Sequence, residues 1–326
     1  MKKLFFVFLL ISLRLTVFTQ ARPEIKNLVF AGAGIRGIAY CGAIQEMESQ
    51  KLMNSIENVG GTSAGAIIAL MVSLGYSGSE IEEIIDKTNF KRFNDGSYLF
   101  VGGINRLNRY FGWYKGKMVE DWLEKIIRQK TGNAGITFQE LHQGGWKDLY
   151  ITGTCLNRQK LIVFSHQSYP NMKVKDAVRI SMSIPLYFEA VFINANGNII
   201  RHPRQKQRLD IMVDGGFTGN FPIHVFDTIN KRATVGFRID SEDQVKSDKK
   251  ERIITAMPVA NLKQYANAFY NIIIENLNRQ QMTDEDWQRT ISISDGNIGP
   301  RIRRLSQKQI DTLIENGRQA MKNYLN

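Results

Sequence analysis

Val59-Gly60-Gly61-Thr62-Ser63-Ala64-Gly65 is the stretch that decides how the fold of this 326-residue chain is interpreted. A short apolar segment, residues 56–59, leads into it, and an apolar run over residues 66–71 follows. A G-x-S-x-G pattern between a strand and a helix is typical of a nucleophile elbow, a turn so sharp that glycine is needed on both sides of the serine. The predicted elbow comprises Gly61, Thr62, Ser63, Ala64 and Gly65, with the Ser63 hydroxyl exposed at the end of a sheet. An ordinary turn in which Ser63 caps the helix is the alternative.

A second glycine-rich turn precedes the elbow in the chain. Residues 25–31 are a predicted buried strand that ends in Gly32-Ala33-Gly34-Ile35-Arg36-Gly37, before a predicted helix over residues 38–51. The G-x-G-x-x-G spacing fits a dinucleotide-binding loop, but that motif expects an acidic residue where the elbow stands. A tight turn without a ligand is a further alternative. We favour an oxyanion hole formed by the backbone N–H groups of this loop, because neighbouring parallel strands end at the same edge of a sheet.

A carboxylate ends the third apolar strand, Ile211-Met212-Val213, and the chain continues as Asp214-Gly215-Gly216. Two glycines after an acidic residue give backbone access to the carboxylate, so Asp214 is the second candidate catalytic residue. A turn or helix-capping aspartate is the alternative.

Composition bounds the class of protein. The chain is 43% hydrophobic and 23% charged, which is typical of a folded globular protein. Its length suits one large domain, which we predict over residues 21–326, with the core motifs in residues 25–240 and a helical C-terminal part in residues 255–326. The formal net charge of +12 suits an anionic membrane surface, and charge alone does not predict a nucleic-acid partner.

The histidines and cysteines predict neither a metal site nor a cofactor. The histidines are scattered along the chain, and none has a second ligand at zinc spacing. These residues are His142, His166, His202 and His224. Cys41 and Cys155 lie in apolar contexts that favour buried free thiols.

Residues 1–20 have a basic start and an apolar run too short to span a bilayer. This pattern predicts a signal peptide and export to the periplasm or medium, with membrane association. An uncleaved N-terminal membrane anchor is the alternative.

Residues 90–114 combine aromatic side chains with arginines and lysine, which suits a lid or an interfacial surface. Aromatic residues packed over the sheet are the alternative. Farther along, we expect a helix over residues 79–86 capped by Ser79 and Glu82, a charged surface loop over residues 241–251, and long helices over residues 259–281 and 306–325.

Taken in order, the glycine loop, the serine elbow and the aspartate turn resemble the motifs of the patatin-like phospholipases. The resemblance extends over residues 25–240 and includes Arg179-Ile180-Ser181-Met182-Ser183-Ile184-Pro185 and the pair Asn220 and Pro222. It implies an α/β fold, a three-layer α/β/α sandwich with a mainly parallel central sheet. One departure is Ala33, where the family usually has glycine; a positive φ there would cost about 1 kcal/mol or more.

The resemblance also implies a chemistry. Ser63 would be the nucleophile, Asp214 the general base, and the loop from Gly32 to Gly37 the oxyanion hole. Such a dyad would hydrolyse carboxylic esters of phospholipids or other acyl lipids through an acyl-enzyme, as a phospholipase A or lysophospholipase does.

Alternatives remain open at this point. Ser63, Asp214 and His224 occur in the chain order of an α/β-hydrolase triad, which would make the protein an esterase of that class. A catalytically silent lipid-binding module with the same fold is the other alternative.

Overall fold

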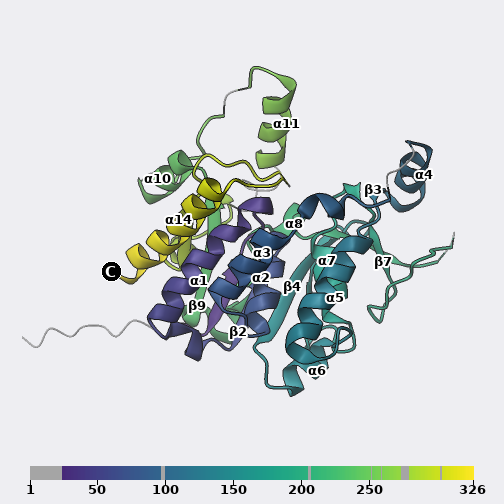
Figure 1. The fold of residues 1–326 in the computed structure, drawn as a ribbon, viewed down its shortest axis with the longest axis horizontal. Coiled ribbons are helices and arrows are strands. Elements are labelled where there is room, and N and C mark those ends of the chain that lie inside the picture. The colour runs from purple at the N-terminus through teal and green to yellow at the C-terminus, as the bar shows by residue number, and fades with distance from the viewer. Residues whose placement is uncertain are drawn as a thin grey trace, which may run out of the picture.

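A mixed, mainly parallel sheet forms the centre of the molecule (Figure 1). The computed structural model describes residues 24–96, 100–204, 207–250, 252–257, 259–272, 279–301 and 303–326. The predicted N-terminal segment, residues 1–20, lies outside them, as does Tyr98 of the predicted lid. The predicted α/β class is confirmed.

The strand order across the sheet is β10, β9, β1, β2, β4, β8, β7, with β5 also paired to β4. The first five strands in this order, from β10 to β4, are parallel to one another. Strands β5 and β8 run antiparallel to β4, and β7 runs antiparallel to β8. A separate two-stranded sheet pairs β3 with β6. The strands span β1 Asn27–Phe30, β2 Asn58–Gly61, β3 Gly112–Tyr114, β4 Asp148–Cys155, β5 Lys160–Phe164, β6 Leu186–Phe188, β7 Val191–Ile193, β8 Asp210–Asp214, β9 Thr234–Asp240 and β10 Thr290–Ser294.

The α-helices cover both faces of this sheet. They span α1 Ala39–Ser49, α2 Ala64–Ser73, α3 Gly78–Lys87, α4 Phe100–Tyr110, α5 Lys117–Thr131, α6 Phe138–Gln143, α7 Val174–Ser181, α8 Gly216–Gly219, α9 Asp227–Asn230, α10 Glu242–Lys250, α11 Leu262–Tyr270, α13 Asp284–Gln288 and α14 Gln307–Leu325. Short 3-10 helices at Gly34–Ile38, Leu52–Ser55, Phe90–Phe93, Ile223–Phe226 and Lys231–Ala233 complete the described helices.

Side chains of β1, and of Ala31 directly after it, show why the fold has three layers. Leu28 and Phe30 enter the large core on one face of the sheet, while Val29 and Ala31 enter a smaller core on the other. Alternate residues of a strand point to opposite faces, so a strand buried on both needs a cover on each side. The layers are unequal, because α1, α2, α7 and α14 cover the first face and the short helices between β8 and β9 cover the second.

Three local predictions were wrong. The predicted loop over residues 241–251 contains α10, whose polar side chains gave no apolar periodicity. The capping box of α3 consists of Ser77 and Glu80, two residues earlier than predicted. The C-terminal part, predicted as helical, also contributes the edge strand β10. Its alternating sequence is short and follows a polar helix, so it resembles a loop when taken alone.

Helices α1 and α14 pack backbone to backbone through two glycines. A Cβ atom at Gly317 would collide with the carbonyl oxygen of Ala39, and one at Gly42 with the carbonyl oxygen of Ile314. The close approach fixes α14 over the first face of the sheet, although it follows α1 by more than two hundred residues.

We expect Gly317→Ala to lower the free energy of unfolding by about 1–3 kcal/mol, because the added methyl group overpacks this contact. Denaturant unfolding followed by circular dichroism measures the change. Gly135→Ala is the matched control, since a Cβ there meets its nearest atom at an ordinary 3.5 Å. Equal stability of the two variants would contradict the packing argument.

Candidate active site

Ser63 occupies the sharp turn between β2 and α2. Its backbone has φ +53° and ψ −120°, a conformation that residues other than glycine rarely adopt. A Cβ at Gly61 would collide with the carbonyl oxygen of Gly65, and one at Gly65 with that of Phe30. The glycines are therefore required by the turn. One hydrogen bond helps to stabilise this strained conformation: the Ser63 N–H donates to Ser181 Oγ at 2.8 Å.

The hydroxyl of Ser63 and the carboxylate of Asp214 meet. Ser63 Oγ donates to Asp214 Oδ2 at 2.6 Å, across 151 residues of sequence. The other carboxylate oxygen accepts from the Gly216 N–H at 2.8 Å. Gly215 lies so close to Thr152 that a Cβ there would be 2.5 Å from Thr152 Oγ1. The predicted proximity of the two side chains is confirmed.

Burial makes Asp214 a stronger base than an exposed carboxylate. Only 4% of the residue is exposed to solvent. Desolvation raises the pKa of Asp214 to about 6, and the hydrogen bonds from Ser63 and Gly216 offset part of that effect. At neutral pH the carboxylate is therefore ionised and able to accept the Ser63 proton.

The first glycine loop lies against the elbow. A Cβ at Gly32 would come within 3.3 Å of Ser63 Cβ, and one at Gly37 within 3.2 Å of Ala64 Cβ. The residue with a left-handed conformation is Gly34, at φ +57°. Ala33 has φ −143°, so the alanine causes no backbone strain. The departure from the family pattern is thus tolerated by the geometry.

Of the first four N–H groups of this loop, two are already committed and two are available. Gly32 N–H donates to the carbonyl oxygen of Asn220 at 3.0 Å, and Ile35 N–H to that of Pro300 at 3.2 Å. Among the hydrogen bonds of the described part of the chain, the N–H groups of Ala33 and Gly34 have no acceptor. They are the loop's candidates for binding an oxyanion.

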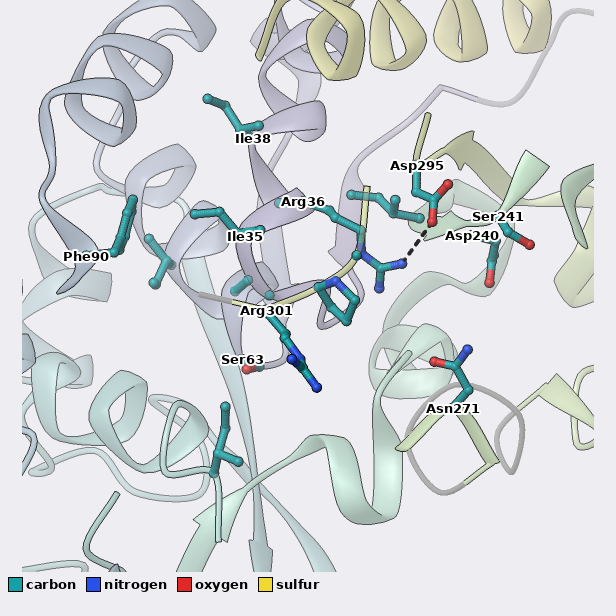
Figure 2. Close-up of a pocket in the computed structure, with 18 of the residues that line it drawn as sticks. Ile35, Arg36, Ile38, Ser63, Phe90, Asp240, Ser241, Asn271, Asp295 and Arg301 are labelled. Carbon is teal, nitrogen blue, oxygen red and sulfur yellow. Dashed lines mark hydrogen bonds and ion pairs between the residues drawn. The ribbon is translucent and has the colours of Figure 1, made fainter. Parts of the chain in front are cut away.

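Arg36 steadies this loop from behind. Its side chain is buried, and Nε donates to the carbonyl oxygen of Ala33 at 3.1 Å. Its guanidinium also pairs with Asp295, which follows β10, at 3.4 Å (Figure 2). Sequence reasoning missed Asp295 and Pro300, because both lie far along the chain and neither belongs to a recognisable motif.

A cavity of about 790 Å³ opens onto Ser63. Its walls differ in character. Apolar side chains form one part, namely Ile67, Ile68, Ile85, Phe90, Phe93, Trp122, Met182, Ile184 and Phe188. Polar side chains line another part, among them Asp240, Asp243, Gln244, Asn271, Asp295 and Arg301 (Figure 2). A ligand with an apolar chain and a polar head fits this division.

The aromatic segment predicted as a lid is partly packed. Phe90 and Phe93 form edge-to-face contacts with Trp122 of α5, at ring-centroid distances of 6.2 and 5.6 Å. These aromatics belong to the cavity wall. Phe111 is one of the segment's exposed aromatics.

His224 does not complete a triad. Its Nε2 lies 2.9 Å from Asp286 Oδ2, and the Ser63 hydroxyl donates directly to Asp214. Arg289 also binds Asp286, which explains why the pKa of that carboxyl lies far below its ordinary value despite burial. The Ser63-Asp214-His224 arrangement expected of an α/β-hydrolase triad is therefore wrong.

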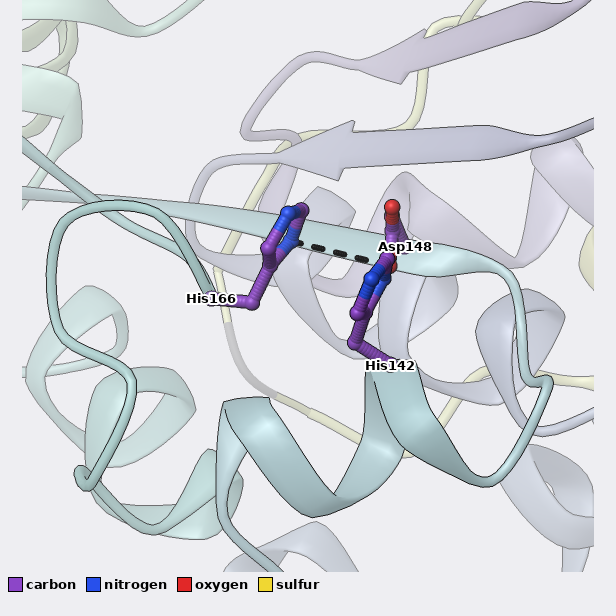
Figure 3. A group of neighbouring side chains, drawn as sticks. All are labelled: His142, Asp148 and His166. Carbon is purple, nitrogen blue, oxygen red and sulfur yellow. Dashed lines mark hydrogen bonds and ion pairs between the residues drawn. The ribbon is translucent and has the colours of Figure 1, made fainter.

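The histidines are less scattered in the fold than in the sequence, because two of them meet at one carboxylate. Asp148 faces both His142 and His166, and the potential ligand atoms of the three side chains lie within 4.8 Å of one another (Figure 3). The three side chains come from separate elements, so spacing along the sequence gave no signal.

The fold and the site together define an α/β protein with a strained serine elbow hydrogen-bonded to a buried carboxylate. Residues 28–227 match the sequence model of the patatin-like phospholipases. The chain belongs to this family of patatin-like lipid hydrolases.

The chain is also similar to individual proteins. An uncharacterized protein of Acanthamoeba polyphaga mimivirus is 29% identical over 305 residues, which cover 93% of this chain and 94% of the relative. A probable lipid hydrolase of Invertebrate iridescent virus 6 is 25% identical over 61% of this chain and 62% of its own. The crystal structure of VipD from Legionella pneumophila is similar with a TM-score of 0.59 at 16% identity, covering 93% of this chain and 67% of that one. That structural likeness shows the fold.

We expect the rate at which a fluorophosphonate probe labels Ser63 to depend on one ionisation near pH 6. Below that pH Asp214 is protonated, so the rate should fall about tenfold per pH unit, and it should level off above about pH 7. Timed labelling at constant ionic strength measures the profile.

Unfolding by acid can be separated from this effect. Because the pKa of Asp214 is raised in the folded chain, this carboxyl favours folding at acidic pH. Circular dichroism at each pH is the control. A rate that stays level through pH 6 in folded protein would contradict the assignment of Asp214.

Proposed function

We propose that this protein is a lipid acyl hydrolase of the phospholipase A or lysophospholipase type that uses a Ser63–Asp214 dyad. The observation that carries the proposal is the 2.6 Å hydrogen bond from Ser63 Oγ to the buried carboxylate, at the cavity. Membership of the patatin-like phospholipase family supports it.

In the proposed first step, Ser63 Oγ attacks the carbonyl carbon of the ester and its proton passes to Asp214. The negative charge that develops on the carbonyl oxygen is stabilised by the N–H groups of Ala33 and Gly34. The tetrahedral intermediate then collapses, the C–O bond to the alcohol breaks, and Asp214 returns the proton to the leaving oxygen.

The second step repeats the chemistry with water. Asp214 takes a proton from water, and the resulting hydroxide attacks the acyl-Ser63 ester. Collapse releases the fatty acid, and the proton on Asp214 returns to Ser63 Oγ. The proposed cycle needs neither a metal nor a cofactor, because the same carboxylate accepts and returns the proton in each step.

The cavity supports an acyl lipid as substrate. Its apolar wall, which includes Ile67, Phe93 and Trp122, suits an acyl chain. Arg301 and several acidic residues line the polar part, where a head group or glycerol would lie. We propose phospholipids or other acyl lipids as the substrate class.

We expect Ser63→Ala to abolish hydrolysis of a lipid ester panel and Asp214→Asn to lower kcat/KM by about 10³-fold or more. The amide of Asn keeps the shape of the carboxylate but does not accept the Ser63 proton. Fatty-acid release from phospholipid, lysophospholipid and neutral-lipid vesicles measures the loss and identifies the preferred class.

His224→Ala is the matched control for these variants. His224 is half exposed and pairs with Asp286, so activity should stay within about twofold of the wild type. Loss of turnover in this variant would contradict a dyad that works without histidine. Folded wild-type protein without hydrolysis or probe labelling would favour the silent lipid-binding module.

We further propose that the protein acts at a membrane surface through α11 and the residues on either side of it. Leu262, Tyr265, Phe269 and Ile272 recur at helical spacing, and each is more than half exposed. Met257 and Asn271 from the same region line the cavity. Figure 1 shows α11 standing away from the sheet. An apolar face beside a lipid-binding cavity suits insertion among lipid head groups.

In the described residues no helix combines the length and apolar character needed to cross a bilayer. The exposed apolar side chains of α11 support a proposed contact with one leaflet of the membrane. Export directed by residues 1–20 stays a proposal as well, and comparison of the N-terminus of the mature protein with the encoded one tests it.

We expect the double variant Leu262→Asp/Phe269→Asp to lower hydrolysis of vesicle lipids by about tenfold or more, since each change removes about 1.5–3 kcal/mol of possible apolar burial. Hydrolysis of a water-soluble short-chain ester should be unchanged. Ile229→Asp, which alters an exposed isoleucine on α9, is the control. A parallel loss on both substrates would argue against the membrane role of α11.

A further inference from the structure

A histidine–aspartate–histidine cluster lies away from the proposed active site. His142 is in the last turn of α6, Asp148 is the first residue of β4, and His166 follows β5 (Figure 3). His142 Nδ1 lies 2.7 Å and His166 Nδ1 lies 3.6 Å from the same oxygen, Asp148 Oδ1. The two imidazole rings stack at a centroid distance of 4.2 Å. Three potential ligand atoms thus converge from three separate elements.

One of these three atoms lacks a hydrogen bond. His166 Nδ1 is buried and has no hydrogen-bond partner among the residues that the structure describes. A buried nitrogen without a partner costs about 1–3 kcal/mol. A metal ion beside Asp148 would supply the missing partner.

The donor set and its spacing suit a first-row transition metal. Zinc binds imidazole nitrogen and carboxylate oxygen at about 2.0–2.2 Å in tetrahedral sites, which places neighbouring ligand atoms about 3.4 Å apart. The 3.6 Å between His166 Nδ1 and Asp148 Oδ1 already fits this spacing. The shorter His142 contact is a hydrogen bond that a metal would replace.

We propose that His142, Asp148 and His166 bind a divalent transition metal of the zinc class, with water completing the coordination. A metal must lie in the plane of each ligating ring, so one imidazole has to rotate out of the stack. His142, whose side chain is 46% exposed, has room for this rotation. Its exposure also gives water access to the site.

The register of the sheet assigns the metal a structural role. Asp148 pairs with Asn58 at the start of β2, whereas Ser63 follows the opposite end of that strand. The cluster and the proposed nucleophile therefore lie at opposite ends of the central strands. A metal would join α6, β4 and the segment after β5 without touching the proposed chemistry.

A similar group, His224, Asp227 and Asp286, makes an instructive contrast. There the Arg289 guanidinium donates to both carboxylates, at 2.7 Å each. A positively charged side chain already pairs with both carboxylates of that cluster. In the first cluster the groups drawn together are two imidazoles and one carboxylate, the residue types of zinc sites.

The test uses full-length protein without a histidine tag, stripped of metal by a chelator and dialysed. Calorimetric titration with Zn²⁺ should show one site per chain, and Zn²⁺ should raise the temperature of unfolding. Co²⁺ as a spectroscopic substitute should give the visible absorption of a four-coordinate site. A stripped wild type that binds neither ion at tens of micromolar metal would overturn the proposal.

The variants locate the site. We expect His142→Ala and His166→Ala each to weaken Zn²⁺ binding at least about tenfold, the smallest effect that loss of even an outer-shell partner has. Asp148→Asn keeps the side-chain shape if an alanine variant fails to fold, and it should weaken binding likewise. His202→Ala removes an exposed histidine elsewhere and should bind Zn²⁺ as the wild type does. Unchanged binding in folded cluster variants would place the metal somewhere else.

Discussion

The hydrogen bond from Ser63 to Asp214 is the contact around which the strand ends are arranged. Asp214 pairs with Gly153 in the register between β8 and β4. On the other side of β4, Gly61 pairs with Ile151, so the chain reaches Ser63 two residues later, level with Gly153. The proposed nucleophile and the carboxylate thus flank the same point of the central strand. The sheet register, more than either loop, brings them together.

The direction of β8 explains why the aspartate is followed by glycines. Because β8 runs antiparallel to β4, it approaches Ser63 from the loop side and has to stop at that level. The turn must leave immediately beside Thr152, where a Cβ at Gly215 would have no room. The next N–H, from Gly216, then reaches back to the carboxylate. The glycines therefore serve both the turn and the position of Asp214.

The sequence was sufficient for features that depend on local chemistry. The elbow, the glycine loop and the aspartate turn can each be recognised in the sequence by glycines that a sharp turn or a close contact requires. The concern over Ala33 was also local, and the structure answers it because the left-handed residue is Gly34. Features formed by distant segments gave no such signal. Asp295 on Arg36, the Pro300 carbonyl on Ile35, and the cluster around Asp148 depend on the tertiary fold alone.

A dyad without histidine has to meet two demands on one carboxylate. The base must be ionised at working pH, and it must still have enough proton affinity to take a proton from an alcohol. A pKa raised to about 6 leaves Asp214 mostly ionised at pH 7, and relative to an ordinary aspartate it favours the proton transfer by about 3 kcal/mol. Deeper burial without the Ser63 and Gly216 hydrogen bonds would protonate the group and remove the base.

In the proposed mechanism the proton transfer from Ser63 is still uphill, so stabilisation of the oxyanion has to supply the difference. One donor is worth about 10² to 10³ in rate, and two are available from Ala33 and Gly34 only while the loop holds its shape. Arg36, Asn220 and the Pro300 carbonyl fix that shape from separate parts of the chain. Because the proposed base is weak, the reaction depends on the oxyanion loop. Parts of the fold outside the three motifs are therefore needed to hold that loop in shape.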